Sequence, residues 1–444
     1  MKNAAKSRVT RIDEETRLKI GSNQLNHLSQ KHLGDFEPSK KRPDPIATLR
    51  ESEKDRIPSL LKVKYARMSV NAYAFFRGSV GIMAKDLAAQ PHTKLMVQLC
   101  GDAHLQNLGC FASPDGRVIF DINDFDETAA GPWEWDVKRM ATSIILAGAQ
   151  CRHDEDGCGE AAATFIRCYC ETLTELASQP TLVAARHVIH RLGKSEAISA
   201  AFQQAERAKP ADLLKKYAVK TSGRYRFKRV PGEWPVSKSD SDAVLRSLAA
   251  YRKTLAPERL HFFNFYQPID VAFKIVGTGS VGLRDYVVLM EGRNAEDALF
   301  LQVKQELASA YAPYLKLTNY DNQGRRVVEG QHRIQPLSDL LLGWTKIGKY
   351  DFLVRQLNDH KGTLDLENMK GKGLASLAQV AGELLARGHA RSGDALAITG
   401  YLGDSEKVQK SIVRFARAYT DQVNLDFAAF QSSVAARKGQ VASA

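Results

Sequence analysis

Apolar residues recur at two different spacings along this chain, and the changes of spacing divide it into helical and strand-rich stretches. Between residues 58 and 90, apolar positions three and four apart predict helices with large side chains on the inward face, namely Tyr65, Met68, Phe75, Phe76 and Met83. Short apolar segments at 95–99 and 117–122 predict strands, and helical periodicity returns from 136 to about 217. Residues 1–56 show little periodicity and contain three prolines, which predicts a polar arm attached loosely to the rest.

The second half of the chain begins with strand-like segments and ends in helices. Three strands are predicted at 272–276, 285–290 and 298–304, where β-branched and aromatic residues are frequent. A helix, two further strands and long helices rich in Ala and Leu follow, at 325–342, 343–348, 350–357 and 371–430. The pattern therefore predicts an α+β protein with one small sheet.

Composition narrows the classes of protein that this pattern allows. With 444 residues and 44% apolar side chains, the chain can bury a sizeable core. No run of about eighteen apolar residues occurs, and the charged N-terminus lacks the apolar centre of a signal peptide, so we expect no membrane partner. Six cysteines in so long a chain do not indicate a disulfide framework, which favours a reducing cytoplasm.

Two features of the composition suggest other ligands, namely zinc and nucleic acid. Four cysteines near His153 suggest zinc, but they form no CxxC pair, and two lie in a helical pattern, which favours buried thiols. The net charge of +13 suggests nucleic acid, yet the positive residues are scattered, with one compact run at 40–42. This distribution argues against a polynucleotide as the main partner and suits a protein that gathers nucleotides or phosphorylated substrates. Arg77 interrupts an apolar face. Its role there is either that of a salt-bridge partner or that of a phosphate contact.

The stretch from 100 to 136 gathers the acidic and amide side chains that a metal–phosphate site needs. Asp102 and Asn107 follow the strand at 95–99, and Asp124 follows the strand at 117–122. Mg²⁺ prefers oxygen ligands, and a further carboxylate can take the proton of an attacking hydroxyl. Asp121 is an alternative metal ligand to Asp124. The whole stretch can also be read as a polar loop that only caps neighbouring backbone.

The stretch from 269 to 306 supplies glycines and a lysine. Gly277, Gly279 and Gly282 form Gly-x-Gly-x-x-Gly between two predicted strands. A dinucleotide-binding fingerprint requires a helix after the glycines, and here a strand follows, which favours a glycine hairpin that lies over phosphates. Lys304 ends the third strand, twenty-two residues after Gly282.

Together these stretches resemble the catalytic core of protein kinases and, more closely, of aminoglycoside phosphotransferase-like small-molecule kinases. Gly101-Asp102-Ala103-His104 with Asn107 is similar to their catalytic loop, although Cys100 replaces the leading His, and Asp124-Phe125-Asp126 is similar to their metal-binding motif. Asp136 falls where those families place an acid that braces the loop. The resemblance implies ATP and Mg²⁺ as cofactors and transfer of a phosphoryl group to a hydroxyl of an unknown small molecule.

The resemblance also implies a role for each residue. Asp102 and His104 are the catalytic residues, and Asp102 accepts the hydroxyl proton or aligns the nucleophile. Metal binding falls to Asn107 and to Asp124, or to Asp121 in its place. The cofactor is held by the glycine loop, by Lys304 on the phosphates and by an acid that orients Lys304, namely Gly277, Gly279, Ser280, Gly282, Lys304 and Glu329. Glu306 is a weaker candidate for that acid because it follows the lysine too closely.

The order of these parts is unusual, since the glycine loop and the lysine follow the catalytic loop by about 175 residues. The segment ELLARGHARSGD, similar to the helix that precedes the catalytic loop in kinases, lies near the C-terminus. Both facts indicate a circularly permuted, two-lobed kinase-like fold, with a small antiparallel sheet lobe and a larger helical lobe. The predicted divisions are an arm at 1–56, a helical catalytic lobe at 57–260, a β-rich nucleotide lobe at 261–357, and helices at 358–444 that pack back on the catalytic lobe.

Over residues 58–430 the chain resembles an uncharacterised bacterial family, domain of unknown function 2252, in motifs such as GPWEWDVKR and VGTGSVG. Three alternatives to phosphoryl transfer remain open at this point. They are transfer of AMP on the same fold, a nucleotide-binding protein without catalysis, and a basic nucleic-acid binder. The sequence does not indicate an oligomeric state.

Overall fold

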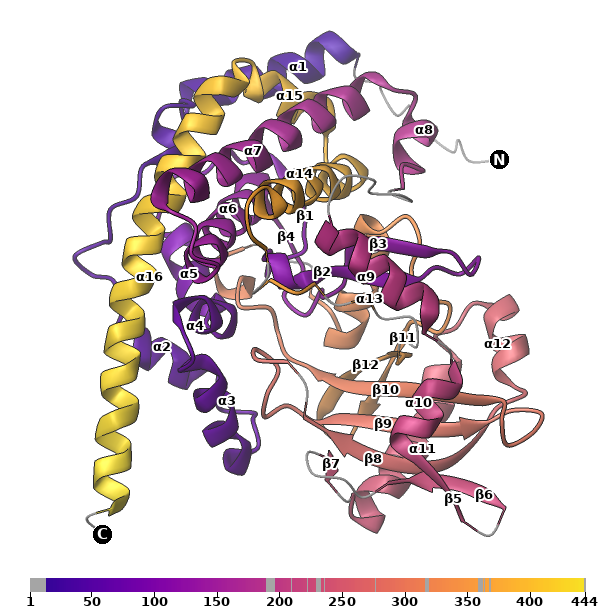
Figure 1. The fold of residues 1–444 in the computed structure, drawn as a ribbon. Coiled ribbons are helices and arrows are strands. Elements are labelled where there is room, and N and C mark those ends of the chain that lie inside the picture. Colours follow the sequence, from indigo (N-terminus) through magenta and orange to yellow (C-terminus); the bar gives the residue numbers. More distant parts are fainter. Residues whose placement is uncertain are drawn as a thin grey trace, which may run out of the picture.

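A six-stranded antiparallel sheet and a larger, mainly helical part form the two halves of the molecule (Figure 1). The structure is a computed structural model. It describes residues 13–188, 196–208, 210–221, 223–228, 233–234, 236–275, 277–315, 319–357, 362, 364–366 and 369–442. The fold is therefore mixed α+β with small antiparallel sheets, as the sequence predicts.

The six-stranded sheet confirms the strands predicted after residue 271. Its strand order is β11-β12-β10-β9-β8-β7. The strands are β7 (Glu233–Trp234), β8 (Gln267–Lys274), β9 (Asp285–Glu291), β10 (Ala298–Glu306), β11 (Gly343–Ile347) and β12 (Tyr350–Gln356). On β10, Lys304 pairs with Asp285 of β9 and with Leu353 of β12, so the lysine is near the middle of the sheet.

Each face of the sheet is covered by a different hydrophobic cluster, because successive side chains of a strand point to opposite faces. Val288, Leu301 and Val303 pack on one face against α11 (Lys238–Arg252). Val287, Leu289 and Phe300 pack on the other face against α10 (Pro210–Tyr217) and the hairpin of β5 (Ala218–Thr221) and β6 (Arg224–Phe227). By this alternation, Lys304 points to the same side of β10 as Phe300.

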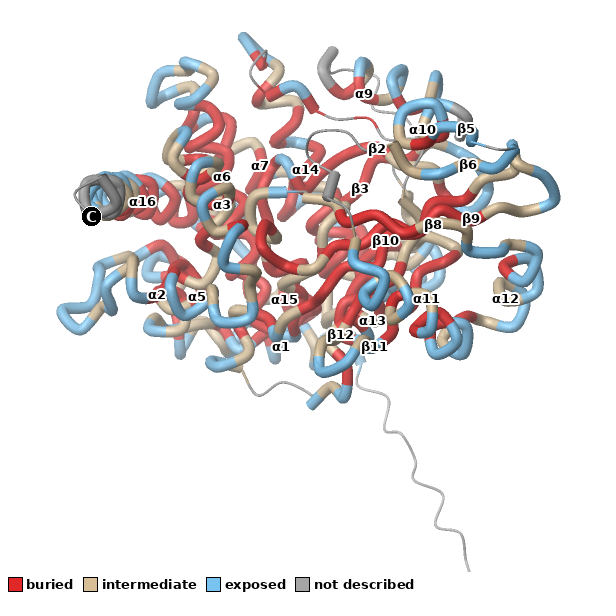
Figure 2. The backbone as a smooth tube through the Cα atoms, turned by 90° about the horizontal axis from the view of Figure 1, so that it is seen from below, coloured by how far each residue is buried: buried red, intermediate tan, exposed pale blue. Residues whose placement is uncertain are grey.

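The helical part is built around the buried helices α6 and α14, which pack with α7 and α16. Figure 2 shows buried residues continuing from these helices into the strands of the large sheet. The long α16 runs along one edge of the molecule (Figure 1). The helices of this part are α1 (Glu14–Asn23), α2 (Pro45–Glu51), α3 (Leu61–Met68), α4 (Ala72–Gly78), α5 (Val80–Ala88), α6 (Trp133–Gln150), α7 (Glu155–Ser178), α14 (Gly373–Ser392), α15 (Ala395–Leu402) and α16 (Ser405–Ala442).

Two short antiparallel pairs carry the acidic loops between the halves. The pairs are β1 (Met96–Leu99) with β4 (Ala129–Pro132), and β2 (Leu108–Ala112) with β3 (Val118–Ile122). Four more helices, α8 (Thr181–Ala185), α9 (Glu196–Arg207), α12 (Pro257–Phe263) and α13 (Gln323–Ile334), complete the set of described α-helices. Among the described helices, none combines the length and the apolar character needed to cross a bilayer.

The N-terminal segment is not the loose arm that the sequence predicts, at least from residue 13 onward. Gly21 lies directly against the backbone of Ala397 in α15, an approach that a side chain at position 21 would block. Arg42 forms ion pairs with Asp86 at 2.8 Å and with Asp426 at 2.6 Å. The prediction was wrong because contacts with residues almost four hundred positions away leave no local periodicity.

Candidate functional site

A cavity of about 430 Å³ lies where the acidic loops, the glycine loop and helices α2 to α5 meet. Its volume is within the range of roughly 300–1,000 Å³ that is usual for ligand pockets. Seven of the residues predicted from the sequence line it, namely Asp102, His104, Asn107, Asp124, Gly277, Gly279 and Ser280. Stretches separated by about 175 residues in the sequence therefore share one cavity.

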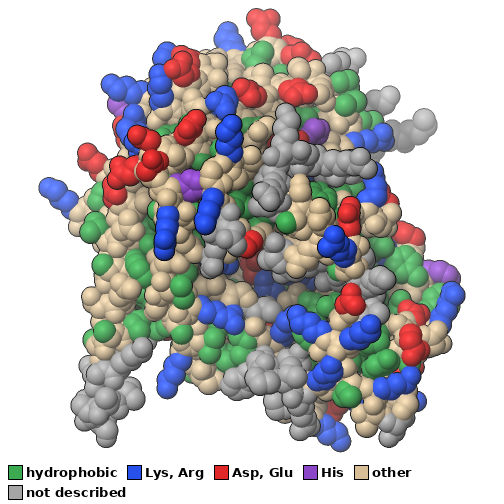
Figure 3. Space-filling view, in the orientation of Figure 1, with side chains coloured by type: hydrophobic (Ala, Val, Ile, Leu, Met, Phe, Trp, Pro, Cys, Tyr) green, Lys and Arg blue, Asp and Glu red, His purple; other side chains and the backbone are tan. Residues whose placement is uncertain are grey.

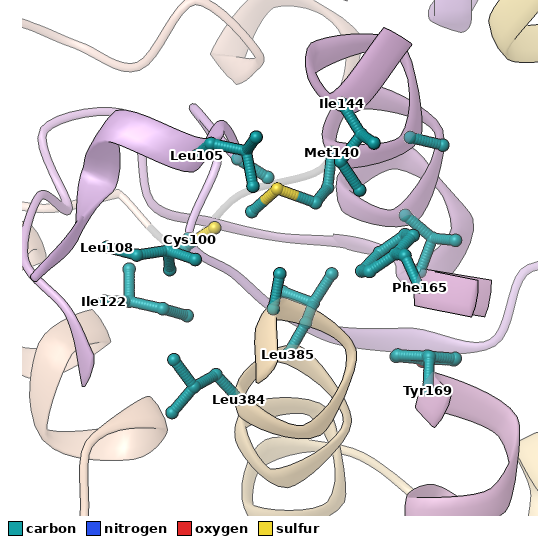
Figure 4. Close-up of a cluster of buried hydrophobic side chains, with 14 of the residues drawn as sticks. Cys100, Leu105, Leu108, Ile122, Met140, Ile144, Phe165, Tyr169, Leu384 and Leu385 are labelled. Carbon is teal, nitrogen blue, oxygen red and sulfur yellow. The ribbon is translucent and has the colours of Figure 1, made fainter. Parts of the chain in front are cut away.

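The loop that carries Asp102 is fixed from both ends. The carboxylate of Asp136, in the first turn of α6, accepts hydrogen bonds from the backbone N–H groups of Cys100 at 2.7 Å and Gly101 at 3.1 Å. Apolar side chains anchor the same loop: Leu105 lies beside Met140 of α6, and Cys100 and Leu108 lie near Ile122 of β3 (Figure 4). All three belong to the core cluster that also contains Leu384 and Leu385 of α14. The contact of Asp136 with the loop agrees with the bracing role that the resemblance implies.

Asp102 is oriented by a buried arginine that the sequence analysis did not identify. Both the Nε and an Nη of Arg139 donate to Oδ1 of Asp102, with the Nε at 2.8 Å. Burial raises the pKa of Asp102 to about 6, because Arg139 offsets burial only in part and Glu127 and Asp124 add repulsion. Arg139 lies three residues after Asp136, so both project from the same side of α6. The three-residue spacing from Asp136 was the signal in the sequence that could have identified Arg139.

His104 lies behind Asp102 as a neutral side chain. Its Nε2 is 3.6 Å from Oδ2 of Asp102, and its buried Nδ1 has no hydrogen-bond partner within the described part of the chain. Burial lowers the pKa of His104 well below its usual value, and the nearby Arg77 and Arg139 lower it further. His104 is therefore a buried, uncharged neighbour of Asp102.

Lys304 faces the metal-binding motif, as the sequence analysis requires. Its Nζ lies 3.9 Å from Oδ1 of Asp124 and makes a shorter contact with Asp126. Burial opposes the charge of Lys304, but the two carboxylates outweigh burial and raise its pKa. Burial also opposes ionisation of Asp124, yet Lys304 lowers its pKa, whereas burial and the repulsion of Asp124 raise the pKa of Asp126.

The acid beside Lys304 differs from the one predicted. Glu329 on α13 does not approach the lysine; it pairs with Arg325 at 2.8 Å and with Arg333 at 3.7 Å. Asp126 takes the place beside the lysine. Asp126 was visible in the sequence two residues after Asp124, but the order of a kinase chain directed attention to a helix after the lysine strand. Glu306, the second candidate, is buried at the cavity, and burial raises its pKa well above the usual value.

Asp121 is a structural residue in this fold. Its carboxylate forms an ion pair with Arg387 of α14, and both side chains are almost completely buried. Asp124, in contrast, lines the cavity with 40% of its side chain exposed. Between the two alternatives that the sequence left open, only Asp124 is in a position to reach a ligand in the cavity.

The glycine loop between β8 and β9 lies at the edge of the cavity. Gly277 and Gly282 have φ angles of +70° and +94°, a region that other residues avoid. Gly279 lies next to the backbone carbonyl of Arg77, and Ser280 lines the cavity. The two strands that flank the loop confirm that it is a hairpin.

The donor set fits a magnesium ion bound together with a phosphate. The amide nitrogen of Asn107 donates to the carbonyl of Asp102 at 2.7 Å, which leaves the amide oxygen for a cation. With the Asp124 carboxylate this gives two protein oxygens, and Mg²⁺ usually completes its shell with water and phosphate oxygens. The described residues contain no cluster of three or more His, Cys, Asp or Glu side chains suited to a metal. The zinc alternative has no support among them, and all six cysteines are free.

On the face of the described chain that Figure 3 shows, basic side chains do not form one continuous track. Figure 3 shows Lys and Arg side chains spread over the visible face, with Asp and Glu side chains between them. Counterion release by a polynucleotide depends on many lysines and arginines along one track. The cavity is therefore the better candidate for the functional site.

Fold and site together define a mixed α+β protein with a cavity lined by acids, glycines and basic side chains. The chain belongs to the bacterial family described as an uncharacterized protein conserved in bacteria, domain of unknown function 2252, which matches residues 56–433. No curated protein and no solved structure shows a significant match to it. The matched region includes every predicted site residue.

Proposed function

We propose that this chain is a Mg²⁺-assisted phosphotransferase of kinase-like architecture that uses ATP and acts on a hydroxyl of a small molecule. The observation that carries the proposal is the approach of the Lys304 amine to the Asp124 carboxylate, 3.9 Å apart, beside a cavity that also holds the glycine loop and Asp102. Phosphoryl transfer needs mainly placement and neutralisation of charge, and these groups supply both.

Each group has a role that follows from its position. Asn107 and Asp124 would hold Mg²⁺, which neutralises phosphate charge when it is bound. The backbone N–H groups of the glycine loop and the Lys304 amine would hold the phosphates. Asp102 would accept the proton of the acceptor hydroxyl through Oδ2, because both hydrogen bonds from Arg139 go to Oδ1.

The contacts of α14 support a circularly permuted kinase-like chain with two lobes. Ser392, at the end of α14, accepts a hydrogen bond from the backbone N–H of Gln98 in β1 at 3.1 Å. His389 of the same helix lies 3.5 Å from Asp136, which holds the catalytic loop. The helix thus ends where the strand leading to that loop begins, although 294 residues separate Gln98 from Ser392. If α14 were joined to β1 here and the chain opened before the six-stranded sheet, then the sheet, α14 and the catalytic loop would follow one another in the usual kinase order.

The test measures which phosphate of ATP is transferred, by following a label on that phosphate. The native chain is incubated with Mg²⁺, the small-molecule fraction of a bacterial extract, and ATP labelled on either the γ- or the α-phosphate. We expect label from the γ-phosphate alone in a new small-molecule product. Transfer of the α-label would indicate AMP transfer instead. Nucleotide that raises the melting temperature without any transfer would indicate binding without catalysis. Either result contradicts the proposal.

A further inference from the structure

We propose that Arg56, Lys64 and Arg77 form a second anion subsite of the cavity, which holds a phosphate group. The inference rests on the proposed function for its assumption that the cavity receives substrates, and it adds the chemical class of a group that must be present there. All three side chains line the cavity. They come from the segment between α2 and the end of α4, which the sequence analysis left without a function, apart from the two alternatives for Arg77.

The subsite lies beside the glycine loop. An Nη of Arg56 donates to the carbonyl of Val281 at 2.5 Å, and Arg67 of α3 donates to the carbonyl of Gly277. Gly279 lies against the backbone of Arg77. These contacts tie the cationic segment to the loop that is proposed to hold nucleotide phosphates.

Among the described residues, none of the three cations forms an ion pair with an acid. Lys64 is 1% exposed, and its one hydrogen bond there is a long one, 3.5 Å, to the hydroxyl of Ser52. The Nε of Arg77 is buried and has no partner in the same set, so the salt-bridge alternative for Arg77 has no support. Within the described part of the chain, Arg56 donates to the carbonyl oxygens of Ser52 and Val281. Lys85, on the same wall, differs because it pairs with Glu51 at 2.7 Å.

Nearby acids compensate for this charge only in part, because Glu127 and Glu53 favour the charged forms of Arg56 and Lys64, yet burial still lowers the pKa of both. Asp102 is held by Arg139, and Asp124 and Asp126 share Lys304. The Glu127 carboxylate accepts a hydrogen bond from the backbone N–H of Ala310 at 2.6 Å. Lys64 is buried and the two arginines are partly buried, and charges without close acidic partners are costly there, so an anion between the three cations would recover part of that cost.

A phosphate fits this arrangement better than a single carboxylate. It carries close to two negative charges near neutral pH and offers oxygens in several directions, which matches two guanidinium groups and one amine. The pKa of Lys64 supports the same conclusion. Burial, and then the neighbouring Arg56, lowers it to about 7, so a nearby anion would favour the charged form of the amine. Two sources supply this chemistry: a phosphate of the nucleotide itself, or a phosphate carried by the acceptor.

The test is calorimetric titration of inorganic phosphate into the native chain without metal, and into Arg77→Gln and Lys64→Met. Met is close in length to Lys and removes a buried amine, so Lys64→Met should fold. Lys410→Gln, at an exposed pair with Glu406 on α16, is the matched control for the change in charge. We expect phosphate to bind the native chain and the control alike, and each cavity variant about tenfold more weakly.

A second set of titrations identifies the source. If phosphate still binds when Mg²⁺ and a non-hydrolysable ATP analogue are saturating, the subsite serves the acceptor. If the analogue displaces phosphate and itself binds the Arg77→Gln chain more weakly, the subsite serves the nucleotide. No binding of phosphate, or equal binding by native and variant chains, overturns the subsite even when nucleotide binds normally. Phosphate binding without any nucleotide binding would instead overturn the proposed function and leave the subsite in place.

Discussion

Replacement of Asp102 by Asn should lower the rate of ADP release from ATP on the order of a thousandfold, about 4 kcal/mol in the barrier, while leaving nucleotide binding nearly unchanged. The amide cannot accept the hydroxyl proton. Its oxygen can still accept both hydrogen bonds from Arg139, because in the native chain both go to Oδ1. The rate is measured under saturating Mg²⁺ and ATP, with the acceptor found by label transfer.

The pH profile provides the internal check on this assignment. Because burial raises the pKa of Asp102 to about 6, the native rate should fall as the pH is lowered through 6, where the carboxylate takes up a proton. The Asn variant has no carboxylate at position 102, so the residual rate should lack this decline. A variant as fast as the native chain would show that Asp102 is not the base.

Replacement of Asp124 by Asn should abolish the stabilisation that Mg²⁺ adds to nucleotide binding. At a free ligand concentration 100 times Kd, a bound nucleotide stabilises a native protein by about 2.7 kcal/mol, which thermal unfolding detects. We expect the native chain to melt at a higher temperature with Mg²⁺ and ATP than with ATP and EDTA. The variant should show equal melting temperatures, because the carboxylate that faces the cavity is lost.

Asp121→Asn is the matched control, since it makes the same chemical change three residues away. Asp121 forms a buried ion pair with Arg387, so its loss should destabilise the fold by about 3–5 kcal/mol. The rise in melting temperature that Mg²⁺ adds in the presence of ATP should nevertheless persist in this variant. If Asp121→Asn removed the Mg²⁺ effect and Asp124→Asn kept it, the assignment of the two acids would be reversed.

Much of the site could be predicted from the sequence because its parts are local motifs. Asp102, Asn107 and Asp124 stand at short spacings beside strands, and the glycines stand between two strands, so each motif indicates its own geometry. The meeting of Lys304 with Asp124 required a longer inference. It could be predicted because the resemblance to kinases supplied both halves of one cavity, even in reversed order.

Most of the contacts that the sequence analysis missed join distant residues. The pairing of Asp121 with Arg387 and the packing of Gly21 on Ala397 depend on tertiary structure and leave no periodic pattern. Glu329 was selected by its place along the chain, and it faces arginines of its own helix instead. Asp126, which contacts Lys304, follows β3 in the chain, and its approach to the lysine depends on how that loop and β10 come together in the tertiary fold.

The central claim is that Mg²⁺ and ATP bind in the cavity beneath the glycine loop. It is tested most directly by calorimetric titration of a non-hydrolysable ATP analogue with Mg²⁺ into the native chain and into Gly279→Asp. Among the described residues, a Cβ atom at position 279 would meet only the carbonyl of Arg77, at 3.5 Å, so this variant should fold and place a carboxylate where phosphates would lie. We predict one site per native chain and at least a tenfold loss of affinity in the variant. Equal affinities, or no binding to the native chain, would contradict the account.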